Sequence, residues 1–89
     1  MRRLGRSLCR ICGYDAGDFL PWGEDGKTPS CEYCPCCGVE WGYQDSSRVG
    51  VEKFRAAWLA QGAPWRGRYE KPDGLDAATR LRRLGIDAG

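Results

Sequence analysis

The sequence predicts a small metal-bound α+β fold, with a cysteine-rich first half of turns and short strands followed by two C-terminal helices. Three observations lead to this fold class. All six cysteines lie between positions 9 and 37 of the 89-residue chain. That half contains no run of helical periodicity, whereas the second half contains two such runs. A chain of this length buries a modest fraction of its surface, so a metal or disulfide staple is expected.

One short phrase, Cys-x-x-Cys-Gly, occurs twice in the first half, at residues 9–13 and 34–38, which we term the first and the second knuckle. An acidic residue and then a glycine follow each knuckle at matching positions, as in a repeat. Paired thiolates at this spacing bind tetrahedral metal ions in small domains. The glycine of each knuckle can take the positive φ that turns the chain away. We therefore predict a zinc ribbon in which the two knuckles lie side by side.

Six cysteines compete for the four ligand positions of such a site. Cys9 and Cys12 form the first pair. For the second pair, Cys34 and Cys37 keep both the spacing and the following glycine, whereas Cys31 with Cys34 keeps the spacing alone. The interval between the two pairs is close to that of zinc sites with this ligand pattern. We predict that Cys9, Cys12, Cys34 and Cys37 hold the ion.

Cys31 and Cys36 are then spare thiols whose role the sequence leaves open. They could be second-layer thiols beside the ligands, members of a larger cluster, redox-active groups or small buried residues. We favour the last of these, because free cysteine is among the most often buried residue types. Six cysteines could also pair as disulfides, but clustered thiols in the reducing cytosol more often hold metal.

Four thiolates suit zinc and iron equally well, because both accept tetrahedral sulfur. We predict one Zn²⁺, with iron as the alternative. Four protein ligands fill the coordination shell of zinc, which is the structural arrangement and not the catalytic one. The sequence has no histidine, the commonest general base, and no glycine-rich phosphate loop. We therefore expect no enzymatic activity.

The first helix is predicted over residues 49–61. Val51, Phe54 and Trp58 follow an i, i+3, i+7 rhythm, which places them on one face of an amphipathic helix. Gly62 provides the expected end, because glycine favours the left-handed position that follows a helix.

A second helix is predicted over residues 75–84. Asp73 is the expected N-cap, and Asp76 and Arg80 form an i, i+4 pair of opposite charge. Gly85 suits the position after the helix end.

Two chain reversals are expected outside the knuckles. Asp25-Gly26, midway between the knuckles, is a strong turn signal and could close a hairpin. Ile86 is expected to fold back onto Leu81, because such a contact often accompanies a helix that ends at glycine.

The chain is expected to be one domain, with a ribbon part over residues 1–45 and a helical part over residues 46–89 packed on it. No low-complexity tract or long linker separates the two parts. Large apolar side chains from both parts are candidates for a shared core: Trp41, Phe54, Trp58 and Trp65.

The net charge of +2 creates no large field for nucleic acid. No secretory signal or membrane span is recognisable, so we expect a cytoplasmic protein. We also expect it to be a monomer. Its partner is expected to be a macromolecule, with protein favoured over nucleic acid. Aromatic and basic side chains of the second half are the candidate partner surface, although we favour a solvated helix face as the explanation of the charges and core packing as that of the tryptophans. They are Trp65, Arg66, Arg68, Arg80, Arg82 and Arg83.

The chain resembles the bacterial cysteine-rich CPCC family of small zinc-ribbon proteins. The residues that carry the resemblance are CRICGY at 9–14, PW at 21–22, DGKTPS at 25–30, CPCCGVEWG at 34–42, then Phe54-Arg55, Trp58 and GAPW at 62–65. CPCCG followed by an aromatic residue and glycine is the most specific element. The resemblance supports the ligand choice and the two-part architecture, and it implies no particular activity.

A weaker similarity is to the iron-binding knuckles of rubredoxins, which are electron carriers with four thiolate ligands. It is carried by Cys12-Gly13-Tyr14 and by Cys34-Pro35-x-Cys37-Gly38. The short interval between the knuckles, the slightly positive net charge and the helical second half depart from the rubredoxin pattern. Iron-based electron transfer is therefore the alternative function.

Overall fold

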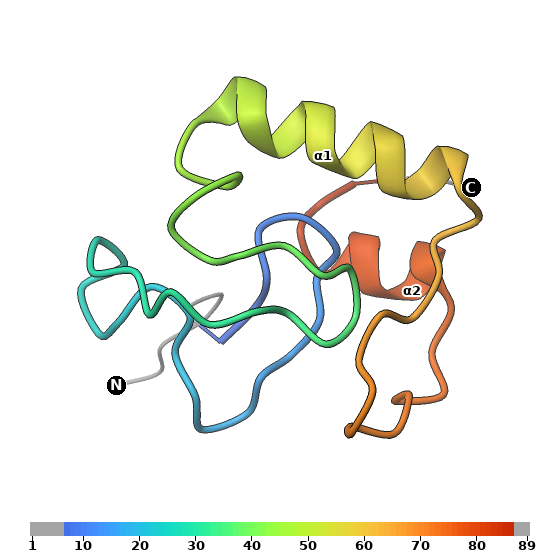
Figure 1. The fold of residues 1–89 in the computed structure, drawn as a ribbon, viewed down its shortest axis with the longest axis horizontal. Coiled ribbons are helices and arrows are strands. Elements are labelled where there is room, and N and C mark those ends of the chain that lie inside the picture. The colour runs from blue at the N-terminus through green and yellow to red at the C-terminus, as the bar shows by residue number, and fades with distance from the viewer. Residues whose placement is uncertain (1–6, 87–89) are drawn as a thin grey trace.

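The computed structural model describes residues 7–86 of the chain. It contains two helices, α1 (Arg48–Ala60) and α2 (Ala77–Arg82), and both lie against the looping cysteine-rich half (Figure 1). The Cα radius of gyration is 12.0 Å, and a compact chain of this length is expected to have a value of about 12 Å. None of the helices in the described range is long and apolar enough to cross a membrane.

The predicted short strands are absent from residues 7–86. The only pairing of this kind that the described residues form is two isolated antiparallel bridges, Leu8 with Asp15 and Tyr33 with Glu40. Each bridge closes one knuckle. The knuckle glycine reverses the chain within a few residues, and no alternating apolar run extends the pairing beyond one bridge.

The loop between the knuckles reverses at Asp25-Gly26, as predicted. The Asp25 carboxylate accepts hydrogen bonds from the backbone N–H groups of Lys27 and Thr28, and Gly26 has a φ of +72°. The Thr28 N–H donates to the carbonyl oxygen of Trp22 at 2.9 Å. The loop therefore closes on itself, although no strands flank the turn.

Helix α1 confirms the predicted first helix, with a start one residue earlier. The Ser47 hydroxyl caps its N-terminus by accepting a hydrogen bond from the Gly50 N–H at 3.0 Å. At the other end Gly62 has a φ of +92°, and the Ala63 N–H returns to the Trp58 carbonyl at 2.9 Å. These bonds satisfy the carbonyl groups of the last turn.

Helix α2 is shorter than the second predicted helix and begins later. Its N-cap is Asp76, whose carboxylate accepts from the Thr79 N–H at 2.8 Å, so the assignment of Asp73 as the cap was wrong. The predicted pair between Asp76 and Arg80 is also absent. The Arg80 guanidinium instead contacts the Asp73 carboxylate at 2.6 and 3.0 Å. The Arg80 side chain lies on the buried side of the helix, where the Asp73 carboxylate is within its reach.

The end of α2 forms as expected. Gly85 has a φ of +79°, and the Ile86 N–H donates to the Leu81 carbonyl at 3.1 Å. This is the return contact predicted between Ile86 and Leu81.

The two halves of the chain share one core, which is built around the cysteines. Of the four large apolar residues predicted for it, Trp41 and Trp58 are buried, and Phe54 and Trp65 pack against it while partly exposed. The other buried members of this cluster are Cys9, Ile11, Cys12, Cys34, Cys36, Cys37 and Val39.

Helix α1 is also tied to the first knuckle by hydrogen bonds. The Arg55 guanidinium donates to the carbonyl oxygens of Ile11 and Arg10, both at 2.7 Å. A charged donor satisfies two backbone acceptors that the tight turn leaves unpaired. Arg55 thus fixes the position of the helix relative to the knuckle.

Candidate metal centre

The structure brings together Cys9, Cys12, Cys34 and Cys37. Their four sulfur atoms all lie within 4.8 Å of one another. The Sγ atoms of Cys9 and Cys37 are 3.7 Å apart, and those of Cys12 and Cys34 are also 3.7 Å apart. Four sulfurs around one zinc ion at about 2.3 Å are separated from each other by about 3.8 Å. The four cysteines are therefore placed to hold a metal ion.

The backbone of the two knuckles has the same hydrogen-bond pattern. In the first, the Cys9 N–H donates to the Tyr14 carbonyl at 2.8 Å, and the Gly13 N–H donates to the Cys9 carbonyl at 2.9 Å. The corresponding bonds of the second knuckle both measure 2.9 Å. Gly13 and Gly38 have φ values of +82° and +83°, as the sequence predicted for these glycines. Each knuckle therefore presents its two sulfurs in the same way.

All four sulfurs are withdrawn from water, and none of the four residues is more than 1% exposed. Burial opposes ionisation of Cys9, yet hydrogen bonds from the other three thiols and from Trp41 hold its pKa well below the usual value. Hydrogen bonding with the neighbouring sulfurs, followed by burial, raises the pKa of Cys12, and burial raises the pKa of Cys37. Cys12 and Cys37 therefore resist ionisation beside Cys9, and a divalent cation would remove that conflict by replacing the protons.

The indole of Trp41 adds a donor beside this cluster. Its Nε1 is buried and has no ordinary hydrogen-bond partner among residues 7–86. The same indole is one of the groups whose hydrogen bonding lowers the pKa of Cys9. A buried N–H that favours the ionised form of a neighbouring thiol fits a metal thiolate, because ligating groups usually receive a supporting hydrogen bond. The donor set and its surroundings are thus compatible with a bound metal ion.

The two remaining thiols lie in different environments. Cys36 is buried, and a hydrogen bond with Cys12 lowers its pKa despite the opposing effect of burial. Cys31 is exposed and has a φ of +64°, so the expectation that both spare thiols are buried was wrong for Cys31. Its backbone is fixed by a hydrogen bond to Trp41 in the turn before the second knuckle, which leaves the side chain in solvent. All six cysteines are free thiols in the structure.

One residue of the predicted basic surface, Arg80, is buried in the structure. Arg80 is 5% exposed, and its guanidinium is occupied by Asp73 and by the Leu75 carbonyl. Arg82, the last residue of α2, and Arg83, its C-cap, are exposed, and Arg83 donates to the Gly13 carbonyl at 3.0 Å. Arg80 is therefore a structural residue and cannot contact phosphate as the sequence had suggested.

The other predicted surface residues lie in the loop after α1. Arg66 and Arg68 are exposed, and Arg66 donates to the Gln61 side chain. Trp65 is half-buried, and its indole N–H donates to the Glu70 carbonyl at 3.0 Å. The indole N–H of Trp65 thus stabilises the loop and is not free to bind a partner.

Sequence reasoning missed a buried polar group that supports the site. Asp45 is fully buried and accepts hydrogen bonds from the Trp22 indole at 2.9 Å and from the Gly42 N–H at 2.7 Å. The Arg10 guanidinium stacks on the Trp22 ring, 3.8 Å from its centroid. These contacts join the two knuckles through the intervening loop. No local pattern signals them, because the partners are far apart in the sequence.

Comparisons with known proteins find a similarity to a bacterial protein. The chain is 28% identical over 69 residues to the uncharacterized protein YozI of Bacillus subtilis (strain 168), and the match covers 61% of this chain. The chain spans 57% of the length of that relative. No family model matches the chain, and no solved structure matches it.

Proposed function

We propose that the chain is a zinc-binding protein in which Cys9, Cys12, Cys34 and Cys37 hold one structural Zn²⁺, and that it belongs with the small zinc ribbons of the CPCC family. The observation that carries the proposal is the packing of four buried sulfurs within 4.8 Å of one another. Zinc in comparable sites contributes on the order of 10 to 16 kcal/mol of apparent binding energy. A whole domain is typically stable by roughly 5 to 15 kcal/mol. The ion would therefore account for most of the stability of this fold.

The role that follows from such a site is that of an interaction module and not of an enzyme. Four thiolates leave zinc no open position for substrate or water, and the sequence offers no histidine as a general base. We place the protein in a reducing compartment such as the cytoplasm, where thiols stay available to metal. A protein partner is favoured over nucleic acid, because the net charge is only +2 and Arg80 is buried.

The test is the metal content of protein purified under reducing conditions, measured by elemental analysis. We expect one zinc per chain and a colourless solution. Serine variants of each of the four ligands should lose the metal. Cys31→Ser and Cys36→Ser are matched controls that change a cysteine outside the ligand set, and both should keep it.

Two results would contradict this proposal. If Cys36→Ser lost the metal while Cys34→Ser or Cys37→Ser kept it, Cys36 would be a ligand and the proposed set of four would be wrong. Red protein with one iron per chain would favour the rubredoxin-like alternative, since the same four thiolates suit iron.

A further inference from the structure

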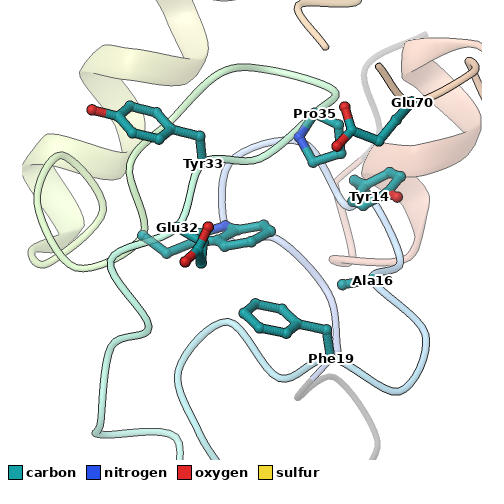
Figure 2. Close-up of a pocket in the computed structure, with 8 residues that line it drawn as sticks. Tyr14, Ala16, Phe19, Glu32, Tyr33, Pro35 and Glu70 are labelled. Atoms are coloured by element: carbon teal, nitrogen blue, oxygen red, sulfur yellow. The ribbon is translucent and has the colours of Figure 1, made fainter. Parts of the chain in front are cut away.

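A shallow depression of about 250 Å³ lies on the surface (Figure 2), and three of the residues that line it, Tyr14, Ala16 and Trp41, belong to or pack against the cysteine-containing core. It is built from segments far apart in the sequence, before, within and after the second knuckle. The residues that line it are Tyr14, Ala16, Phe19, Glu32, Tyr33, Pro35, Trp41 and Glu70. We term it the aromatic groove.

Four of the eight lining residues are aromatic, and two of these present much of their surface to solvent. Phe19 is 43% exposed and Tyr33 is 65% exposed. The ring of Phe19 packs on Trp41 with a centroid distance of 5.8 Å and an angle of 32° between the planes. Trp41 is itself buried, so one face of the Phe19 ring packs on the core while the other face is exposed to solvent. A supported aromatic face in a hollow is typical of an anchor site for a partner.

The charge of the aromatic groove is one-sided. Glu32 and Glu70 lie on opposite sides of it (Figure 2). Within residues 7–86 neither carboxylate makes a hydrogen bond or an ion pair, although Arg80 and Arg48 show that carboxylates elsewhere in the chain find arginine partners. None of the lining residues is cationic. Two negative groups without a partner among residues 7–86 therefore flank a set of electron-rich ring faces.

We propose that the aromatic groove binds an arginine side chain of a protein partner. A guanidinium stacks on aromatic rings by its planar face and forms paired hydrogen bonds with carboxylates through its edge. The groove offers both kinds of contact within one hollow. A nucleic-acid backbone is the wrong partner here, because its phosphates would face two carboxylates. The inference rests on the proposed role as an interaction module, and it does not depend on which metal is bound.

The probe for the test is a seven-residue glycine-serine peptide that contains two arginines, titrated into ¹⁵N-labelled metal-loaded protein and followed by NMR. We expect amide shifts concentrated at Phe19, Glu32 and Glu70. A matched peptide with citrulline, which keeps the shape of arginine and loses its charge, should bind at least about fivefold more weakly.

Paired variants distinguish binding in the aromatic groove from attraction to surface charge in general. Glu32→Gln and Glu70→Gln should each weaken binding of the arginine peptide by about threefold. Glu52→Gln makes the same change on exposed α1 and should have no effect. Phe19→Ala should also weaken binding, whereas Tyr43→Ala removes an exposed aromatic residue outside the groove and should not.

Several outcomes would overturn the inference. Equal binding of the arginine and citrulline peptides would show that the groove does not select charge. Shifts spread over all acidic residues would show nonspecific attraction. Concentration-dependent shifts at the groove without peptide would identify a second copy of the chain as the occupant, and shifts there with a single-stranded oligonucleotide would identify nucleic acid. Metal content is measured on the same samples, so failure of the zinc site is recognised separately from failure of the groove.

Discussion

Single residues determine how closely the parts of the site approach one another. Gly13 combines a φ of +82° with direct packing against α2, since a Cβ at this position would lie 2.0 Å from the carbonyl oxygen of Arg80. Gly17 has a similar φ of +68° but nothing within 4 Å of the same point. Alanine substitution at Gly17 therefore measures the free-energy cost of a left-handed backbone alone, whereas substitution at Gly13 adds the cost of a steric clash.

Gly13→Ala is predicted to destabilise the metal-loaded protein much more than Gly17→Ala. Gly17→Ala should cost about 1 to 2 kcal/mol, which is the penalty for an L residue in this backbone region. Gly13→Ala should cost about 2 kcal/mol more, because backbone atoms must also move apart. Urea unfolding of the two variants measures the difference, and equal costs would show that α2 does not pack on the first knuckle.

The Trp41 indole is predicted to strengthen metal binding through Cys9. Trp41→Phe removes the N–H donor and should lower zinc affinity by about tenfold, the lower end of the effect of such supporting groups. Competition with a chromophoric chelator measures the affinity. The sulfur-to-metal charge-transfer band of the cobalt-substituted protein should also move, because the sulfur loses a hydrogen bond.

Trp65→Phe is the matched control for Trp41→Phe. Its indole N–H donates to the Glu70 carbonyl at 3.0 Å and not to a cysteine sulfur. Zinc affinity and the cobalt band should stay close to those of the unmodified protein. An unchanged band in Trp41→Phe would show that the indole has no hydrogen bond to the ligand.

At the scale of elements, the short helix α2 is held in place by a partly buried ion pair. Helix α2 has six residues, too few to be stable alone in water. Arg80 contacts the Asp73 carboxylate at 2.6 Å, and Asp73 lies in the loop before the helix. The hydrogen bond from Arg80 is the main reason that the pKa of Asp73 lies below its usual value. The ion pair therefore joins α2 to the loop before it, and Arg80 packs against Gly13 of the first knuckle.

Asp73→Asn is predicted to destabilise the protein by about 2 kcal/mol at neutral pH, because it leaves Arg80 buried without its counter-charge. The figure lies below that of a fully buried pair, because Asp73 retains contact with water. Asp18→Asn, an exposed control in the loop after the first knuckle, should change the stability by less than about 0.5 kcal/mol. Chemical denaturation of both variants measures the effect.

The pH dependence of this pair has a definite sign. The folded pKa of Asp73 is lowered, so its stabilisation is fully present above the unfolded value of about 3.9 and is lost as the pH falls through the folded pKa. An NMR titration of the Asp73 carboxyl carbon, carried down to the pH at which the metal is released, should show this carboxylate still ionised at pH values where an ordinary aspartate takes up its proton. In Arg80→Met the pKa should move back toward the usual value, and no movement would contradict the assigned cause.

Local patterns predicted some elements and missed others for physical reasons. The periodicity of α1 and the glycine that ends it are local signals, and the helix forms almost where they place it. At α2 two aspartates, Asp73 and Asp76, are both suitable caps, and the choice between them is decided by a tertiary contact to Arg80. The strands were expected from composition alone, and the tight turns of the knuckles leave room for one bridge each.

The same division applies to the candidate site. The spacing of the cysteines is local and leads to the four residues that the structure brings together. The Trp41 donor and the buried Asp45 depend on contacts between distant segments, so no spacing rule could find them. The exposed position of Cys31 follows from a positive φ that is unusual for a residue other than glycine.

At the scale of the whole molecule, the cysteines form the centre of the core as well as the candidate site. Five of the nine residues of the buried cluster are cysteines, and only Ile11, Val39, Trp41 and Trp58 are not. So few apolar side chains provide little stability by themselves in a chain of this size. Stability should therefore depend on whatever binds the sulfurs.

Removal of the metal is predicted to unfold the protein. Addition of a strong chelator at neutral pH under reducing conditions should abolish the near-ultraviolet circular dichroism of the packed tryptophans, and added zinc should restore it. Acid should have the same effect, because protons compete with the metal for thiolate sulfur as the pH falls. Apoprotein that keeps its tryptophan signal would show that the apolar core is sufficient without the ion.

The most direct measurement of the central claim is X-ray absorption at the zinc edge of the metal-loaded protein, which reports the number, type and distance of the ligand atoms. Coordination by Cys9, Cys12, Cys34 and Cys37 predicts four sulfur atoms at about 2.3 Å and no nitrogen or oxygen ligand. A shell with fewer than four sulfurs, or with nitrogen or oxygen in it, would contradict the assignment of these four cysteines as the site.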